Sequence, residues 1–166
     1  SEVVVGIIGF GKIGKTLASY LEPFKTDILV FDPIIDNNSV LPKKVKSVEF
    51  RELLKQSDAI SIHVPLIEDT LGLIGDKEIS LIKEGSVLVN LSRGGVVDED
   101  AVYNGLTRGN LAGAAFDVFA LEPDNNPYLV KLNNFFCTPH IAGTSKKSSS
   151  LLGIAAINGL AEKIIN

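Results

Sequence analysis

The amino-acid sequence predicts a single α/β domain built on a doubly wound parallel sheet, with helices on both faces. Short β-rich runs alternate with helical patterns along the chain. The runs are continuously apolar, as in VVVGII and SVLVN, which is typical of parallel strands that are covered on both faces. A length of 166 residues is also that of one domain.

Strands and helices are predicted in alternation. The strands are Val3–Ile8, Ile28–Phe31, Ala59–Ile62, Ser86–Asn90, Ala112–Phe116 and Asn134–Cys137. The helices are Lys12–Leu21, Glu49–Gln56, Lys77–Ile82, Glu99–Leu106 and a last one from about Ser145 to Ile164. Pro23 ends the first helix, because proline has no amide hydrogen and clashes with the preceding turn. Asp76 and Asp98 are predicted N-caps, whose carboxylates accept hydrogen bonds from first-turn amides.

Composition excludes several classes of partner. The hydrophobic fraction of 45% and the charged fraction of 22% are ordinary for a globular domain. The net charge is −4 and no basic face is gathered, so no nucleic acid is expected. No apolar run approaches the roughly 20 residues of a membrane span, so no membrane is expected either. Cys137 is the only cysteine and no metal-ligand spacing occurs, so we expect no disulfide, no metal and a cytoplasmic setting.

The segment GFGKIG follows the first predicted strand and opens the first helix. Gly9 would make the tight turn, Gly11 would let a pyrophosphate approach the backbone, and Gly14 would let the helix pack close to the strand. The helix N-terminus would then offer free N–H groups and a partial positive charge to phosphates, with Lys12 adding a point charge. This arrangement is typical of the dinucleotide-binding Rossmann fold.

Asp32 strengthens this interpretation, because it lies about 20 residues after the glycines at the end of the next strand. A carboxylate there can accept hydrogen bonds from both ribose hydroxyls of an adenosine, and it would repel a 2′-phosphate. The sequence therefore predicts NAD, and not NADP, as the cofactor. The structural alternative is a glycine-built turn with a strand-end Asp that acts only as a cap.

Three later segments place polar side chains just past predicted strands, where ligands of open α/β sheets bind. Arg93 follows one strand, Asp117 and Glu122 follow the next, and His140 follows the last. Hydride transfer between a ketone and an alcohol needs a cation for a substrate carboxylate, which Arg93 offers as a planar fork. His140 can exchange the alcohol proton. Glu122 can hold the imidazole tautomer and stabilise its charged form.

With these residues in place, the chain resembles the NAD-binding domain of the D-isomer-specific 2-hydroxyacid dehydrogenases. This family includes phosphoglycerate dehydrogenase, glyoxylate/hydroxypyruvate reductase and D-lactate dehydrogenase. The resemblance covers nearly the whole chain, so residues 1–166 are expected to form one NAD-binding domain. Its motifs are VGIIGFGKIGK, HVPL, NLSRGGVVDEDAV, AAFDVFALEP and TPHIAGT.

The resemblance implies a role for each matching position. Arg93 would bind the substrate, Glu122 would pair with the histidine, and His140 would be the proton donor. Asp117 would hold the nicotinamide carboxamide. The remaining cofactor-lining positions would be Lys12, Ile13, Asp32, Val64, Leu91, Ser92 and Gly143, beside the three glycines and the catalytic Arg93 and His140.

The resemblance also bears on assembly and activity. Family enzymes have a separate substrate domain, which we expect to be absent from this chain, so we also expect NAD binding with weak or no turnover on a 2-hydroxy or 2-oxo acid. A homodimer through this domain is expected. Apolar helical positions such as Val102, Leu106, Leu151 and Ile154 could form the interface, or could simply be core.

Other interpretations stay open at the level of sequence. Arg93, Glu122 and His140 could each be an ordinary surface or turn residue. His63 is a rival histidine, predicted to be structural or part of the cofactor wall. An NAD(H)-sensing interaction module is the alternative function, since the family resembles transcriptional co-repressors that keep the cofactor site. Formate dehydrogenase is disfavoured, because Pro139 and Ile141 flank His140 where a further polar group is needed.

Overall fold

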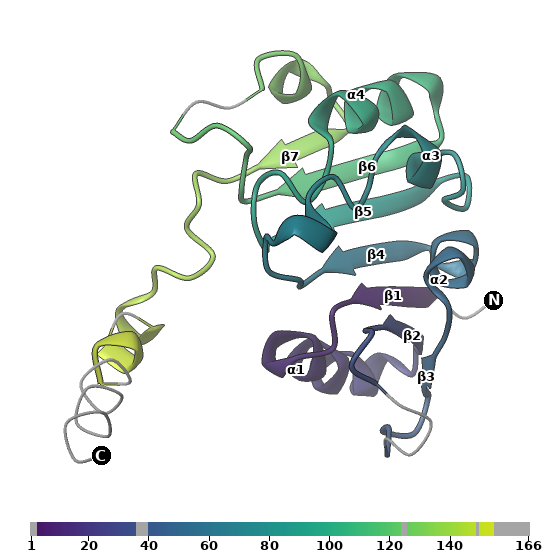
Figure 1. Ribbon diagram of the computed structural model, residues 1–166, viewed down its shortest axis with the longest axis vertical. Coiled ribbons are helices and arrows are strands. Elements are labelled where there is room, and N and C mark those ends of the chain that lie inside the picture. The colour runs from purple at the N-terminus through teal and green to yellow at the C-terminus, as the bar shows by residue number, and fades with distance from the viewer. Residues whose placement is uncertain (1–2, 36–39, 124–125, 149, 155–166) are drawn as a thin grey trace.

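The structure is a computed structural model that describes residues 3–35, 40–123, 126–148 and 150–154. Within these residues the chain forms a seven-stranded sheet with the order β3-β2-β1-β4-β5-β6-β7 (Figure 1). Every neighbouring pair of strands is parallel. The strands are β1 (Val4–Ile8), β2 (Asp27–Phe31), β3 (Val45–Ser47), β4 (Ala59–Ile62), β5 (Ser86–Asn90), β6 (Leu111–Phe116) and β7 (Phe135–Cys137).

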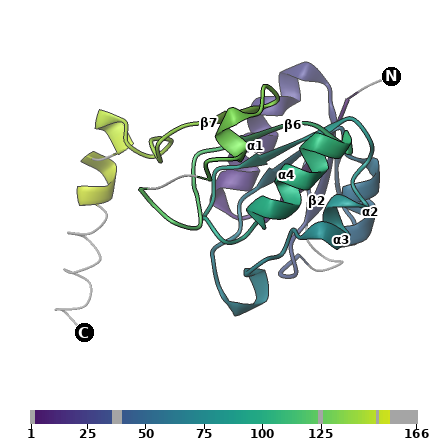
Figure 2. The ribbon, with the colours of Figure 1, turned by 90° about the horizontal axis from the view of Figure 1, so that it is seen from above.

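Helices lie on both faces of the sheet (Figure 2). The α-helices are α1 (Lys12–Leu21), α2 (Phe50–Gln56), α3 (Asp76–Ile79) and α4 (Glu99–Arg108), and the short 3-10 turns are η1 (Glu22–Phe24), η2 (Glu68–Thr70) and η3 (Leu129–Lys131). Residues 146–148 and 150–154 are also helical and stand away from the sheet (Figure 1). None of the described helices has the length and apolar content needed to cross a membrane.

The predicted elements are largely confirmed. Lys12–Leu21, Ala59–Ile62 and Ser86–Asn90 have the predicted bounds at both ends, and most of the other elements differ by one or two residues. The predicted helix Lys77–Ile82 is shorter, because α3 ends at Ile79. The strand β3 was not predicted, since it is a three-residue edge strand whose second and third residues are exposed. Most of the last predicted helix lies outside the described residues.

One of the two predicted helix caps is confirmed. The Asp98 side chain accepts hydrogen bonds from the amides of Asp100 and Ala101, as an N-cap does. The prediction for Asp76 is wrong, because Gly75 is the N-cap of α3 and Asp76 is already helical. The Glu78 side chain accepts the Gly75 amide hydrogen bond, so an acidic residue inside the first turn closes this helix end.

The core consists of two hydrophobic clusters on opposite faces of the sheet. One packs α1 on the strands β1, β2 and β3, through residues such as Ala18, Ile7 and Val30. The other packs α2, α3 and α4 on the opposite face. Val102 and Leu106 of α4 are buried in this second cluster, so for these two positions core packing is the alternative that holds, and not a dimer interface.

The described helices do not cover the two faces of the sheet evenly. The described helix on the α1 side packs on β1 to β3 alone, and side chains that point to that side from β5 and β7 are partly exposed. Val87 is 37% exposed and Phe136 is 66% exposed. The continuously apolar strands thus predicted burial on both faces correctly for the centre of the sheet, but not for β5 and β7.

The parallel arrangement positions the candidate site. Because all the strands run in one direction, the turns that follow them lie at the same edge of the sheet. The strand order then sets the sequence of these turns along the edge. The turn after β2 is next to the turn after β1, then come those after β4 and β5, and those after β6 and β7 come last.

Candidate functional site

The loop between β1 and α1 needs its glycines for different reasons. Gly9 has a φ of 91°, and a Cβ atom there would lie 2.7 Å from the carbonyl oxygen of His63. A Cβ on Gly14 would overlap the carbonyl oxygen of Gly9, so the first turn of α1 packs directly on the loop. A Cβ on Gly11 would meet no described atom within 4 Å. The loop is therefore closed around Gly9 and Gly14 and open at Gly11.

The first turn of α1 has no side-chain cap. Gly11 occupies the N-cap position and the turn contains no acidic residue. The first amides of a helix have no intrahelical acceptor, and they carry the positive end of the helix dipole. Lys12 is exposed at the same place. This helix end is suited to an anionic group.

Asp32 connects the glycine loop to the end of β2. Its Oδ2 accepts a hydrogen bond from the Phe10 amide at 2.7 Å, and its Oδ1 accepts one from the Ile34 amide at 3.0 Å. The carboxylate lies in the wall of a cavity of about 540 Å³ between the glycine loop and the segment after β2. The apolar part of the wall comes from Phe10, Ile34, Ile35, Val40 and Leu41.

A second cavity, of about 210 Å³, lies where α1 begins and where β4 and β5 end. Its lining contains five residues that were predicted to line the cofactor, namely Ile13, Val64, Leu91, Ser92 and Arg93. His63 lines the same cavity, and its Nε2 is 2.8 Å from the Ser61 hydroxyl. Burial lowers the pKa of His63, which keeps the imidazole neutral at neutral pH.

Asn90 holds the turn that presents Arg93. This side chain is buried, and its Oδ1 accepts hydrogen bonds from the amide and the hydroxyl of Ser92 at 3.1 and 2.9 Å. Its Nδ2 donates to the carbonyl of Arg93 at 3.1 Å. The sequence analysis did not identify Asn90 as a functional residue. Its position as a polar residue at the end of the apolar run SVLVN could have indicated it.

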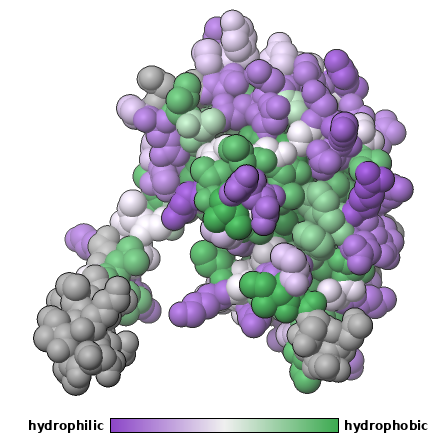
Figure 3. Space-filling view, in the orientation of Figure 1, coloured by the Kyte–Doolittle hydropathy of each residue, from purple (hydrophilic) through white to green (hydrophobic). Residues whose placement is uncertain are grey.

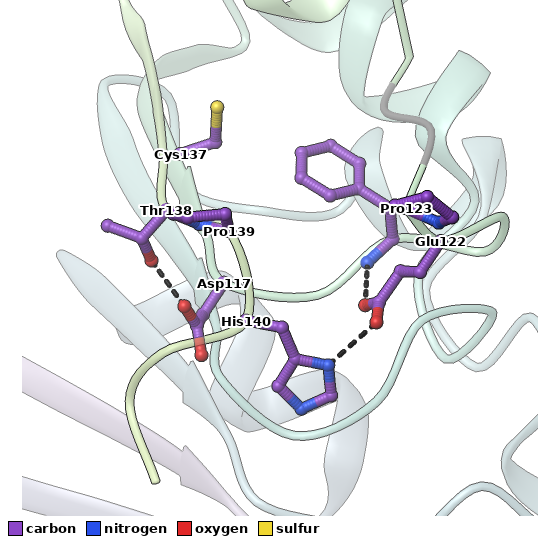
Figure 4. A pocket seen from close by; sticks show the side chains of 8 residues that line it. Asp117, Glu122, Pro123, Cys137, Thr138, Pro139 and His140 are labelled. Atoms are coloured by element: carbon purple, nitrogen blue, oxygen red, sulfur yellow. Dashed lines mark hydrogen bonds and ion pairs between the residues drawn. The ribbon is translucent and has the colours of Figure 1, made fainter. Parts of the chain in front are cut away.

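His140 and Glu122 form the central contact of the site (Figure 4). His140 Nδ1 lies 2.7 Å from Glu122 Oε2, and Glu122 Oε1 accepts a hydrogen bond from the Phe119 amide at 3.0 Å. His140 has a φ of 53°, a left-handed backbone that few residues other than glycine adopt. No described residue forms a hydrogen bond with the other ring nitrogen, Nε2, which leaves that nitrogen available for exchange of a proton.

Asp117 holds the turn that carries His140. Its carboxylate is buried and accepts hydrogen bonds from the Thr138 hydroxyl, from the Ile141 amide at 2.8 Å and from the Ala142 amide at 2.9 Å. The three donors surround His140 in sequence, so this carboxylate fixes the backbone on both sides of the imidazole. Thr138 was not selected from the sequence, because only the fold brings it to Asp117.

Both carboxyl groups are held in the ionised form. Burial raises the pKa of Asp117, but the hydrogen bonds from Thr138, Ala142 and Ile141 and the charge of His140 outweigh burial, so the pKa lies below its ordinary value. The pKa of Glu122 is lowered chiefly by its hydrogen bond with His140 and then by the Phe119 amide. An ionised Glu122 accepts a hydrogen bond from the imidazole and thereby orients its other nitrogen.

The pair faces a third cavity, of about 430 Å³, at the ends of β6 and β7. Besides Glu122 and His140, its walls include Phe119, Pro123 and Cys137. Within the described part of the chain no group of three His, Cys, Asp or Glu side chains could hold a metal ion. The arrangement is suited to moving a proton at a small organic ligand.

The structure brings most of the predicted residues to the sheet edge, but not all into contact. Arg93 is exposed, and its Nη1 donates to the carbonyl of Ser92 at 2.6 Å. Arg93 lines the middle cavity, whereas Glu122 and His140 line the cavity at β6 and β7. Gly143 is exposed in the turn after His140, where a Cβ would meet no described atom within 4 Å.

Comparison with known proteins identifies a family. A family model described as "D-isomer specific 2-hydroxyacid dehydrogenase, NAD binding domain" matches residues 1–142. The D-3-phosphoglycerate dehydrogenase of Archaeoglobus fulgidus is 38% identical over 163 residues, which are 97% of this chain and 30% of that protein.

Solved structures agree with this match. A glyoxylate reductase from Paecilomyes thermophila superimposes with a TM-score of 0.88 at 32% identity, over 98% of this chain and 49% of that one. A D-lactate dehydrogenase from Aquifex aeolicus, complexed with NAD and lactic acid, gives a TM-score of 0.84 at 32% identity, over 98% of this chain and 53% of that one. The chain therefore spans between about a third and about half the length of these proteins.

The buried carboxylate of Asp117 gives a pH-dependent contribution to stability. We expect Asp117→Asn to lower the free energy of unfolding by about 1–3 kcal/mol at pH 7, because an amide nitrogen cannot accept the hydrogen bonds that a carboxylate oxygen accepts. The folded-state pKa of Asp117 is lowered, so this contribution is complete well above the ordinary pKa of an aspartate and is lost as the pH falls through that value toward the lowered pKa.

Denaturant unfolding of the wild-type chain and of Asp117→Asn at pH 7, 5 and 3 measures the difference in their free energies of unfolding. Asp69→Asn, which removes an exposed carboxylate in η2, is the control and should change stability by less than about 0.5 kcal/mol. A difference for Asp117→Asn that grows toward low pH would contradict the assigned role of its carboxylate.

Proposed function

The chain belongs to the D-isomer specific 2-hydroxyacid dehydrogenase family as an NAD-binding domain, and from this premise we propose that it serves hydride transfer between NAD(H) and a D-2-hydroxy acid. In one direction NAD accepts a hydride from the D-2-hydroxy acid, and in the other NADH reduces the corresponding 2-oxo acid. The observation that carries the proposal is the 2.7 Å contact between His140 Nδ1 and Glu122 Oε2. It lies at the same sheet edge as the glycine loop and Asp32.

The residues at this edge fit NAD. Gly11 leaves space beside the uncapped first turn of α1, where the amides and Lys12 would bind the pyrophosphate. Asp32 would accept the adenosine ribose hydroxyls, since a carboxylate has acceptor positions beyond the two that Phe10 and Ile34 use. The cavity with Ile13, Val64, Leu91 and Ser92 would enclose the next part of the cofactor.

The chain's own residues would then handle the proton and the substrate. When bound, NAD supplies the hydride acceptor, and NADH the donor. His140 takes or gives the hydroxyl proton at Nε2 while Glu122 holds Nδ1, a service typically worth about 10²- to 10⁴-fold in rate. Arg93 binds the substrate carboxylate as a planar fork. Asp117 holds the turn and has one acceptor position left on Oδ2 for the nicotinamide carboxamide.

The substrate is proposed to be of the phosphoglycerate dehydrogenase type, which the A. fulgidus relative supports. We assign the groups that select it to a separate substrate domain, since the chain spans only part of its relatives. Closure between two domains excludes water and fixes the substrate, so this chain alone would turn over weakly or not at all. A cytoplasmic setting is part of the proposal, supported by the single cysteine.

Binding and turnover can be measured separately on this chain. We expect calorimetric titration with NADH to show binding to one site. Steady-state assays with NADH and hydroxypyruvate, phosphohydroxypyruvate or pyruvate should show turnover far below the roughly 1–1,000 per second of ordinary enzymes. Absence of NADH binding would overturn the proposal. Turnover at the rate of ordinary enzymes would contradict the claim that a second domain is required for activity.

Asp32 should determine both affinity and cofactor choice. We expect Asp32→Ala to weaken NADH binding by about tenfold, the loss of a hydrogen bond to a charged group, and to narrow the preference for NADH over NADPH. Calorimetric titration with both cofactors checks this. Asp27→Ala is the matched control, because Asp27 is an exposed carboxylate at the other end of β2. An unchanged NADH/NADPH preference in Asp32→Ala would contradict the role of Asp32.

The proposed homodimer requires an exposed apolar surface. Figure 3 shows apolar side chains gathered over η2, where Leu66, Ile67 and Leu71 are 45%, 52% and 67% exposed. Such a patch is typical of an interface. We expect Leu71→Glu to convert a dimer to a monomer in sedimentation velocity, whereas Leu121→Glu, at a position 78% exposed, should leave the dimer intact. Dissociation by both variants, or by neither, would place the interface elsewhere.

A further inference from the structure

The peptide unit between Phe119 and Ala120 is held by a hydrogen bond to the start of α4. Glu99, the first residue of that helix, accepts a hydrogen bond from the Ala120 amide through Oε1 at 2.7 Å. The two residues are 21 positions apart in the sequence. This contact joins α4 to the loop that carries Glu122.

The same peptide unit is in contact with the backbone of Gly94. A Cβ atom on Gly94 would overlap the carbonyl group of Phe119 and would lie 2.7 Å from the Ala120 nitrogen. Gly94 follows Arg93 directly, so the turn that presents Arg93 rests on the loop that presents Glu122. The absence of a side chain at position 94 is what allows this approach.

The contacts continue from this peptide unit to His140. The Phe119 amide donates to Glu122 Oε1, and Glu122 Oε2 meets His140 Nδ1. The ring of Phe119 is buried and lies 6.3 Å from the rings of both Phe116 and Phe135. Because the ring is held in the core, the loop cannot relax by turning Phe119 outward.

Glu99 is not needed to cap its own helix. Asp98 already accepts the amide hydrogen bonds of the first turn of α4. Asp100, in the same turn, is exposed, and its side chain forms no hydrogen bond with the described residues. The Glu99 carboxylate is therefore directed to the loop, while its acidic neighbours either cap the helix or face solvent.

We propose that Gly94 and Glu99 are positioning residues, which fix the place where Glu122 presents its carboxylate to His140. Glu99 acts by holding the Ala120 amide, and Gly94 acts by letting the Arg93 turn support the same peptide unit. The proposal rests on the proposed function, because it gives the pair of Glu122 and His140 its task. It assigns the placement of the Glu122 loop to residues whose contacts are with the Phe119–Ala120 peptide unit.

The side-chain carboxyl of Glu122 reports directly on this positioning. Its pKa is lowered by the hydrogen bonds from His140 and Phe119, so a displaced loop should return the pKa toward its ordinary value. We would follow the Glu122 carboxyl carbon by NMR titration of the chain, assigned with Glu122→Gln, and measure amide hydrogen exchange at Phe119 and Ala120. Neither readout requires turnover.

Three substitutions distinguish a positioning role of Glu99 from the effect of removing a negative charge from the first turn of α4. We expect Glu99→Ala to raise the pKa of Glu122 and to speed exchange at the Ala120 amide by about tenfold, as for the loss of a hydrogen bond to a charged group. Glu99→Gln keeps an acceptor oxygen and should restore both values. Asp100→Ala removes the same charge from the same helical turn and should leave both unchanged.

The proposal is overturned if Glu99→Ala leaves the titration of Glu122 unchanged, if Glu99→Gln behaves as Glu99→Ala does, or if Asp100→Ala has the same effect. Gly94→Ala should raise the pKa of Glu122 with Glu99 intact. If that variant does not fold, the Glu99 variants decide. NADH titration of the same samples tests the proposed function independently. If the wild-type chain failed to bind NADH, the proposed function would be overturned, but the NMR result on the position of Glu122 would still hold.

Discussion

The common direction of the strands is the constraint on which the rest of this structure depends. In a parallel sheet every strand ends at the same edge, so turns that are far apart in the sequence meet there. The order β3-β2-β1-β4-β5-β6-β7 places Asp32 and the glycine loop at neighbouring turns, and places Asp117 and His140 at another neighbouring pair. The three cavities of the site follow from this order.

Buried polar side chains at the strand ends give these turns their shape. A buried amide or carboxylate is costly unless its hydrogen bonds are made. Asn90 and Asp117 each close an apolar strand, and each directs its hydrogen bonds to the backbone of the turn that presents a functional side chain. The cost of burial is thus offset by the same contacts that orient Arg93 and His140.

The pair of His140 and Glu122 is held differently, because it lies near the surface. The two side chains are 48% and 35% exposed, and water screens an ion pair of this kind. Attraction alone would leave both side chains free to move. The backbone on each side supplies the order, through Asp117 around His140 and through the Phe119 amide at Glu122.

Much of the architecture could be predicted from the sequence alone, because it depends on local chemistry. Apolar runs of strand length, the glycines of GFGKIG and the cap at Asp98 each act on the chain within a few residues. The positions of Gly9, Gly11, Gly14 and Asp32 along the chain predicted the loop that the structure contains.

Other features depend on contacts between distant segments, and these only the tertiary structure decided. The edge strand Val45–Ser47 is too short and too polar to carry a signal. How far the described helices cover β5 and β7 depends on where α1 lies. Thr138 meets Asp117, and Glu99 meets Ala120, only because parallel strands bring their ends together. Sequence patterns report on neighbours along the chain, whereas these hydrogen bonds join residues that are neighbours only in space.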